Sequence, residues 1–92
     1  MKTEKDQKIA LIVDDDTEFL DMISDTLTHP RFEIRSSFAR DGYEAVDQIV
    51  KARPDILFID FALPRANAGE ILPKLRLVPE LSGMPVYFIT GY

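Results

Sequence analysis

The fold of this chain is decided by residues 8–16, which read Lys-Ile-Ala-Leu-Ile-Val-Asp-Asp-Asp. Five consecutive apolar residues run directly into three carboxylates. A short apolar run of this kind predicts a strand buried on both faces, as in the middle of a parallel sheet. Asp14, Asp15 and Asp16 then lie at the carboxyl end of that strand, where they form the first candidate site.

The same pattern recurs further along the chain. Residues 56–59 form a second apolar run, which ends in Asp60 and is followed by a loop over residues 61–68. Residues 86–89 form a third run, which ends in Thr90. We expect residues 56–59 to repeat the buried first strand and residues 86–89 to form a further apolar strand, each with an oxygen-bearing side chain at its carboxyl end. Residues 32–36 alternate apolar and polar residues, which predicts a less buried strand.

Helical spacing of apolar residues separates these strands. It predicts a first helix over residues 17–28, capped by Asp16 or Thr17, and a second that opens at Asp41-Gly42 and stops before Pro54. Ile71, Leu72 and Leu75 suggest a short third helix, which Pro79 terminates. Phe19, Phe58 and Phe88 are expected in the core, and His29 is expected to be an exposed residue at a helix end.

The order β-α-β-α-β-α-β predicts an α/β fold with a parallel, doubly wound sheet and helices on both faces, in one domain over residues 1–92. In such open sheets the functional site lies outside the carboxyl ends of the strands. This edge should therefore collect Asp14, Asp15, Asp60 and Thr90. Held together, the three carboxylates repel one another unless a cation joins them.

Composition limits what that site can bind. The chain has no cysteine and one histidine, so a metal must sit on oxygen ligands, which suits Mg²⁺ or Mn²⁺. A formal charge of −5 argues against a nucleic-acid partner. No stretch has the pattern of a signal peptide or a membrane span, so we expect a cytoplasmic protein that does not bind membranes.

Four stretches together resemble the receiver domains of two-component response regulators, which have a flavodoxin-like fold. They are residues 8–16, residues 39–45 (Ala-Arg-Asp-Gly-Tyr-Glu-Ala), residues 55–64 (Asp-Ile-Leu-Phe-Ile-Asp-Phe-Ala-Leu-Pro) and residues 85–91 (Pro-Val-Tyr-Phe-Ile-Thr-Gly). The resemblance implies the sheet order 2-1-3-4. It also implies a phosphorelay role, with a sensor histidine kinase or phosphotransfer protein as partner.

The resemblance assigns a role to each candidate site residue. Asp60 would accept the phosphoryl group, and the hydroxyl of Thr90 would hydrogen-bond one of its oxygens. Asp14 and Asp15 would help to bind Mg²⁺, with Asp15 as the direct ligand of the pair. The backbone carbonyl of Ala62 would complete the protein ligands, beside Asp60 itself. Such a domain is a self-catalysed phosphoacceptor rather than a turnover enzyme.

The sequence also departs from the family pattern. The family continues with a further helix, strand and helix, and its fifth strand carries a lysine that pairs with the phosphoryl group. This sequence stops at Tyr92, so we expect a shortened receiver domain in which Arg65 is the nearest substitute cation. Asn67-Ala68 stands where the family has Asp-Gly. Residues 86–89 would form an exposed apolar edge, which predicts a homodimer through that strand.

Other interpretations stay open. Asp14 to Asp16 alone would suit a solvated loop with a helix cap. The chain could be a receiver-like protein-interaction module that works without phosphorylation, which the missing lysine favours. Phosphatases of the haloacid dehalogenase type also place acids after a buried strand, but their motif requires Thr or Val where this sequence has Glu18.

Overall fold

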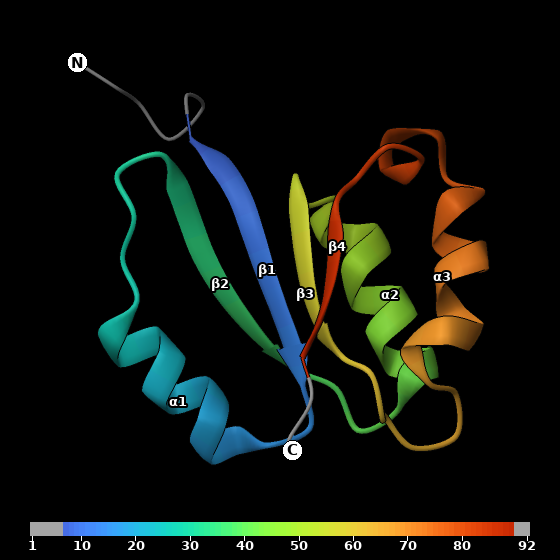
Figure 1. Cartoon of the computed structure of the whole chain (residues 1–92), viewed down its shortest axis with the longest axis horizontal. Coiled ribbons are helices and arrows are strands. Elements are labelled where there is room, and N and C mark those ends of the chain that lie inside the picture. The colour runs from blue at the N-terminus through green and yellow to red at the C-terminus, as the bar shows by residue number, and fades with distance from the viewer. Residues whose placement is uncertain (1–6, 90–92) are drawn as a thin grey trace.

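The computed structural model describes residues 7–89, which form a four-stranded parallel sheet with three α-helices (Figure 1). The strands are β1 (Lys8–Asp14), β2 (Phe32–Phe38), β3 (Ile56–Asp60) and β4 (Val86–Ile89). They lie in the order β2-β1-β3-β4, and all three pairings are parallel. The predicted α/β class and the strand order that the resemblance implied are confirmed.

The helices are α1 (Thr17–Thr26), α2 (Gly42–Ala52) and α3 (Ala68–Arg76), with a short 3-10 helix at Pro79–Leu81. Helix α1 lies on one side of the sheet, and α2 and α3 lie on the other (Figure 1). No helix within residues 7–89 is long and apolar enough to cross a membrane.

The first helix is shorter than predicted. It ends at Thr26 rather than Thr28, because Leu27 takes an extended conformation with φ −91° and ψ 122°. The backbone N–H of Leu27 still donates to the carbonyl of Ile23 and closes the last turn. The chain then continues through residues 27–31, outside any helix, to the start of β2.

The main core lies between the sheet and the α2–α3 layer. Its fully buried large side chains come from β1, β3, α2, α3 and the 3-10 helix: Val13, Leu57, Ile59, Ile49, Ile71, Leu75 and Leu81. Each such burial contributes about 1.5–3 kcal/mol relative to exposure. The guanidinium of Arg76 donates to the carbonyls of Leu81 and Met84, at 2.8 and 2.7 Å, and so ties α3 to the turn that leads into β4.

The other face of the sheet is only partly covered. Strand β3 was predicted to be buried on both faces like β1, but only its Leu57 and Ile59 are buried, whereas Ile56 and Phe58 are half-buried. Phe88 was expected in the core and is 47% exposed, because β4 lies at the edge of the described sheet. These two expectations were wrong. Strand β3 has a strand on each side, but the face that carries Ile56 and Phe58 is only partly covered, and β4 has no further strand beside it in the described sheet.

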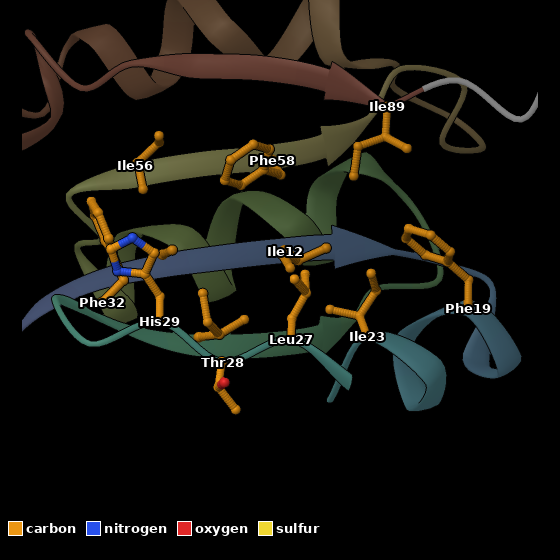
Figure 2. Close-up of a pocket in the computed structure, with 12 residues that line it drawn as sticks. Ile12, Phe19, Ile23, Leu27, Thr28, His29, Phe32, Ile56, Phe58 and Ile89 are labelled. Atoms are coloured by element: carbon orange, nitrogen blue, oxygen red, sulfur yellow. The ribbon is translucent and has the colours of Figure 1, made fainter. Parts of the chain in front are cut away.

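A hollow of about 360 Å³ opens beside α1 on this face (Figure 2). Its lining is almost entirely apolar and comes from all four strands, from α1 and from the segment that follows it. Ile12, Ile23, Leu27 and Phe58 are among the side chains drawn around it in Figure 2. His29 is exposed, as predicted, and contributes to one end of the lining.

Candidate metal centre

Three carboxylates meet at the carboxyl edge of the sheet. Asp14 is the last residue of β1, Asp15 follows it, and Asp60 is the last residue of the adjacent strand β3. One carboxylate oxygen from each lies within 4.8 Å of those of the other two. Parallel pairing of β1 and β3 brings the two strand ends to the same edge, although the residues are far apart in sequence. We call Asp14, Asp15 and Asp60 the acid cluster.

Asp14 is the buried member of the acid cluster and is only 7% exposed. Its Oδ1 accepts a hydrogen bond from the backbone N–H of Asp16 at 3.1 Å. Burial raises the pKa of Asp14, and the nearby charge of Asp60 raises it further, whereas backbone N–H groups of Asp16 and Asp15 act in the opposite direction. A buried carboxylate beside two others is costly, and a bound cation would remove that cost.

The other two members are accessible from solvent. Asp15 is exposed and Asp60 is half-buried, so both can reach an ion that enters from outside. Oδ1 of Asp60 accepts the backbone N–H of Ala62 at 3.1 Å, which turns the following loop back over the strand end. The backbone N–H of Phe61 donates to the carbonyl of Ile89 at 3.1 Å and ties this loop to β4.

The third acid of the first run has a structural role. Oδ1 of Asp16 accepts the backbone N–H of Phe19 at 3.2 Å, and Asp16 is the N-cap of α1. The capping interpretation is therefore right for Asp16. It does not describe Asp14, whose carboxylate lies in the acid cluster instead.

Comparison with known proteins identifies the family. The family model for the response regulator receiver domain matches residues 10–92. The chain belongs to this family. The receiver domain is 34% identical over 82 residues to the probable transcriptional regulatory protein TcrX of Mycobacterium tuberculosis, covering 89% of this chain and 33% of TcrX. It is 33% identical over 87 residues to a protein-glutamate methylesterase/protein-glutamine glutaminase of Pyrococcus horikoshii, covering 92% of this chain and 23% of that protein.

Solved structures agree with the family assignment. The chemotaxis response regulator CheY4 of Vibrio cholerae superposes with a TM-score of 0.73 at 28% identity, covering 89% of this chain and 67% of CheY4. The chain thus spans a third or less of the two curated relatives and two thirds of this solved chain. It is a receiver domain of two-component signalling with the expected flavodoxin-like fold.

Ala62 and Arg65, two other residues to which the sequence assigned a role at this site, lie among the described residues. Ala62 is exposed in the loop that begins at Asp60, two residues after it. Thr90 lies outside the described residues. Nη1 of Arg65 is 3.5 Å from Oδ2 of Asp41, and its guanidinium lies over the ring of Tyr43 at 5.5 Å. Arg65 is therefore engaged with α2, which weakens its expected role as a substitute for the lysine.

The loop after Asp60 accommodates the departure from the family pattern. Oδ1 of Asn67 accepts the backbone N–H of Glu70 at 3.0 Å, so Asn67 is the N-cap of α3. Gly69 lies inside the helix, where an added Cβ would sit 3.3 Å from Oδ1 of Asn67. Asn67 therefore caps α3, a role that aspartate fills equally well.

Proposed function

We propose that this receiver domain accepts a phosphoryl group on Asp60 in the cytoplasm. The phosphodonor would be a sensor histidine kinase or a phosphotransfer protein. A divalent ion, Mg²⁺ or Mn²⁺, would be held by Asp14, Asp15, Asp60 and the carbonyl of Ala62. Family membership and the convergence of three carboxylates within 4.8 Å support this proposal.

The donor set fits a hard divalent cation. Mg²⁺ prefers oxygen ligands in an octahedral arrangement and keeps several of its waters, so it needs few ligands from the protein. Three carboxylates carry more negative charge than one such ion neutralises. When bound, the ion would also neutralise charge on the phosphoryl group during transfer.

In the proposed reaction, one oxygen of the ionised Asp60 carboxylate attacks the phosphorus atom in line with the donor's leaving group. A bond forms between that oxygen and phosphorus, the bond to the leaving group breaks, and the leaving group takes the electron pair. The Thr90 hydroxyl would donate a hydrogen bond to a phosphoryl oxygen. The domain modifies itself once and does not turn over a substrate.

Acetyl phosphate with Mg²⁺, followed by intact mass measurement, tests the proposal. The wild-type chain should gain the mass of one phosphoryl group, and Asp60→Asn should gain none. Asp47→Asn is a matched control, because Asp47 is an exposed acid on α2 that has no part in the acid cluster. Omission of Mg²⁺ should also prevent the gain. Modification of Asp60→Asn at the wild-type level would show that the acceptor was misassigned.

We further propose that the 92-residue domain forms a homodimer through β4. This strand lies at an edge of the described sheet, and its Tyr87 and Phe88 are 54% and 47% exposed. Tyr87 stacks on Phe58, which lines the apolar hollow, so the side of the β4 edge that carries Tyr87 adjoins the hollow. Unpaired backbone groups beside such side chains favour pairing with a second strand.

The same surface supports the second candidate function, an interaction module that works without phosphorylation. The engagement of Arg65 with Asp41 and Tyr43 favours it, because this cation is then directed to α2. The phosphorylation assay separates the two functions. A chain that dimerises through β4 and never gains a phosphoryl group would be the interaction module.

A further inference from the structure

The loop that follows Asp60 is held by the start of α2. The backbone N–H of Gly42 donates to the carbonyl of Pro64 at 3.1 Å, and the N–H of Ala66 donates to the same carbonyl at 2.8 Å. Gly42 is the first residue of α2, and N–H groups in the first turn of a helix have no acceptor within the helix. The loop carbonyl therefore satisfies a donor that the helix leaves unpaired.

This contact leaves no room for a side chain at Gly42. A Cβ atom there would lie 1.8 Å from the carbonyl oxygen of Ala66 and 2.7 Å from its carbonyl carbon. No described glycine has a positive φ, so the backbone conformation itself does not require glycine here. Close approach of two backbones is the reason that glycine is needed.

Asp41, the N-cap of α2, adds a second link. Its Oδ1 accepts the backbone N–H of Glu44 at 2.9 Å, while Oδ2 is 3.5 Å from Nη1 of Arg65. Arg65 has φ 70°, a left-handed conformation that costs an ordinary residue about 1–2 kcal/mol. The cap residue of α2 thus pairs with the loop residue whose backbone is strained, and Tyr43 lies under the same guanidinium.

These links confine Ala62 between two anchors. On one side its backbone N–H donates to Oδ1 of Asp60 at 3.1 Å, and on the other the carbonyl of Pro64 is bound to Gly42. Leu63, between the anchors, is buried in the core. The direction of the Ala62 carbonyl is therefore set by groups on both sides.

We propose that Asp41 and Gly42 are positioning residues, which fix the loop after Asp60 and aim the carbonyl of Ala62 towards the acid cluster. The inference rests on the proposed function, in which that carbonyl is a metal ligand. Neither residue would touch the metal. In the sequence, Asp41-Gly42 indicated a helix start and belonged to a stretch that resembles receiver domains, but nothing local shows which loop packs against it.

The test compares Gly42→Ala with Gly83→Ala in the 92-residue chain. Gly83 is a matched control, because an added Cβ there meets no atom within 4 Å. Amide NMR of the metal-free protein reports the loop through the signal of Ala62, and titration with Mg²⁺ alone gives the affinity. Gly42→Ala should shift that signal and weaken Mg²⁺ binding by about tenfold, as loss of a supporting contact around a metal site typically does. Gly83→Ala should change neither.

Asp41→Asn provides a milder variant in case Gly42→Ala does not fold. Asparagine caps a helix as well as aspartate does, so α2 should stay intact while the ion pair with Arg65 is lost. Mg²⁺ affinity should fall by about threefold, the scale of an exposed ion pair. Folded variants that have a lower thermal midpoint and the wild-type Mg²⁺ affinity would overturn the proposal, because these residues would then be merely structural.

Failure of the proposed function has a different signature. If the wild-type chain binds no Mg²⁺, the metal site itself is wrong, and the Ala62 signal in metal-free Gly42→Ala still decides whether α2 fixes the loop. An unchanged Ala62 signal would refute that positioning role. A shifted signal would support it.

Discussion

Asp14→Asn should stabilise the metal-free receiver domain. The substitution removes one negative charge from the acid cluster and keeps an oxygen that can accept the N–H of Asp16, which is now bonded at 3.1 Å. At 4.8 Å, two unit charges repel by about 0.9 kcal/mol in water and about 3.5 kcal/mol at an effective dielectric of 20. Because Asp15 is exposed and Asp60 half-buried, we take the lower end and expect a gain of about 1 kcal/mol in unfolding free energy.

The extra stability of Asp14→Asn should be larger at neutral pH than at acidic pH. Burial, then the charge of Asp60, raises the pKa of Asp14 above its ordinary value of 3.8 in the folded state. A carboxyl with a raised pKa contributes stability that is complete below the ordinary value and is lost as pH rises through the raised value. The stability difference between Asp14→Asn and wild type should therefore be present at pH 7 and disappear as the pH falls below 3.8.

Mg²⁺ should reduce the stability difference between Asp14→Asn and wild type. A ligand at ten times its dissociation constant stabilises the folded state by about 1.4 kcal/mol, so wild type should gain this amount and Asp14→Asn much less. Urea unfolding followed by circular dichroism, in EDTA and in Mg²⁺, measures all four free energies. The reasoning would be refuted if Asp14→Asn were the less stable protein in EDTA, or if both proteins responded equally to Mg²⁺.

Three further predictions concern the cluster, the edge and the core. Asp15→Asn should reduce Mn²⁺ or Mg²⁺ affinity more than Asp47→Asn, and equal affinities in an NMR titration would remove Asp15 as a ligand. Light scattering after size exclusion should give a dimer mass that Phe88→Lys lowers, and a monodisperse wild-type monomer at high micromolar concentration would contradict the β4 interface. Leu81→Ala empties a fully buried site and should cost about 2–5 kcal/mol in urea unfolding; a loss below about 1 kcal/mol would show that the 3-10 helix contributes little to the core.

The strands and their terminal acids were predictable from sequence, because the signals are local. An apolar run that ends in carboxylates specifies a buried strand with acids at one end, as at Asp14 and Asp60. Alternation with helices implies parallel strands, whose carboxyl ends share one edge. The proximity of the carboxylates follows from these rules. The strand order was predicted from the resemblance to receiver domains.

Tertiary structure alone decided which faces are covered and which loop meets which helix. Phe58 is only half-buried, and Gly42 contacts the loop at Pro64. Each of these outcomes depends on residues that are distant in sequence and leave no periodic signal near the residue concerned. The spacing of apolar residues indicates which side chains favour burial. The arrangement of the helices and strands determines whether another residue is present to bury them.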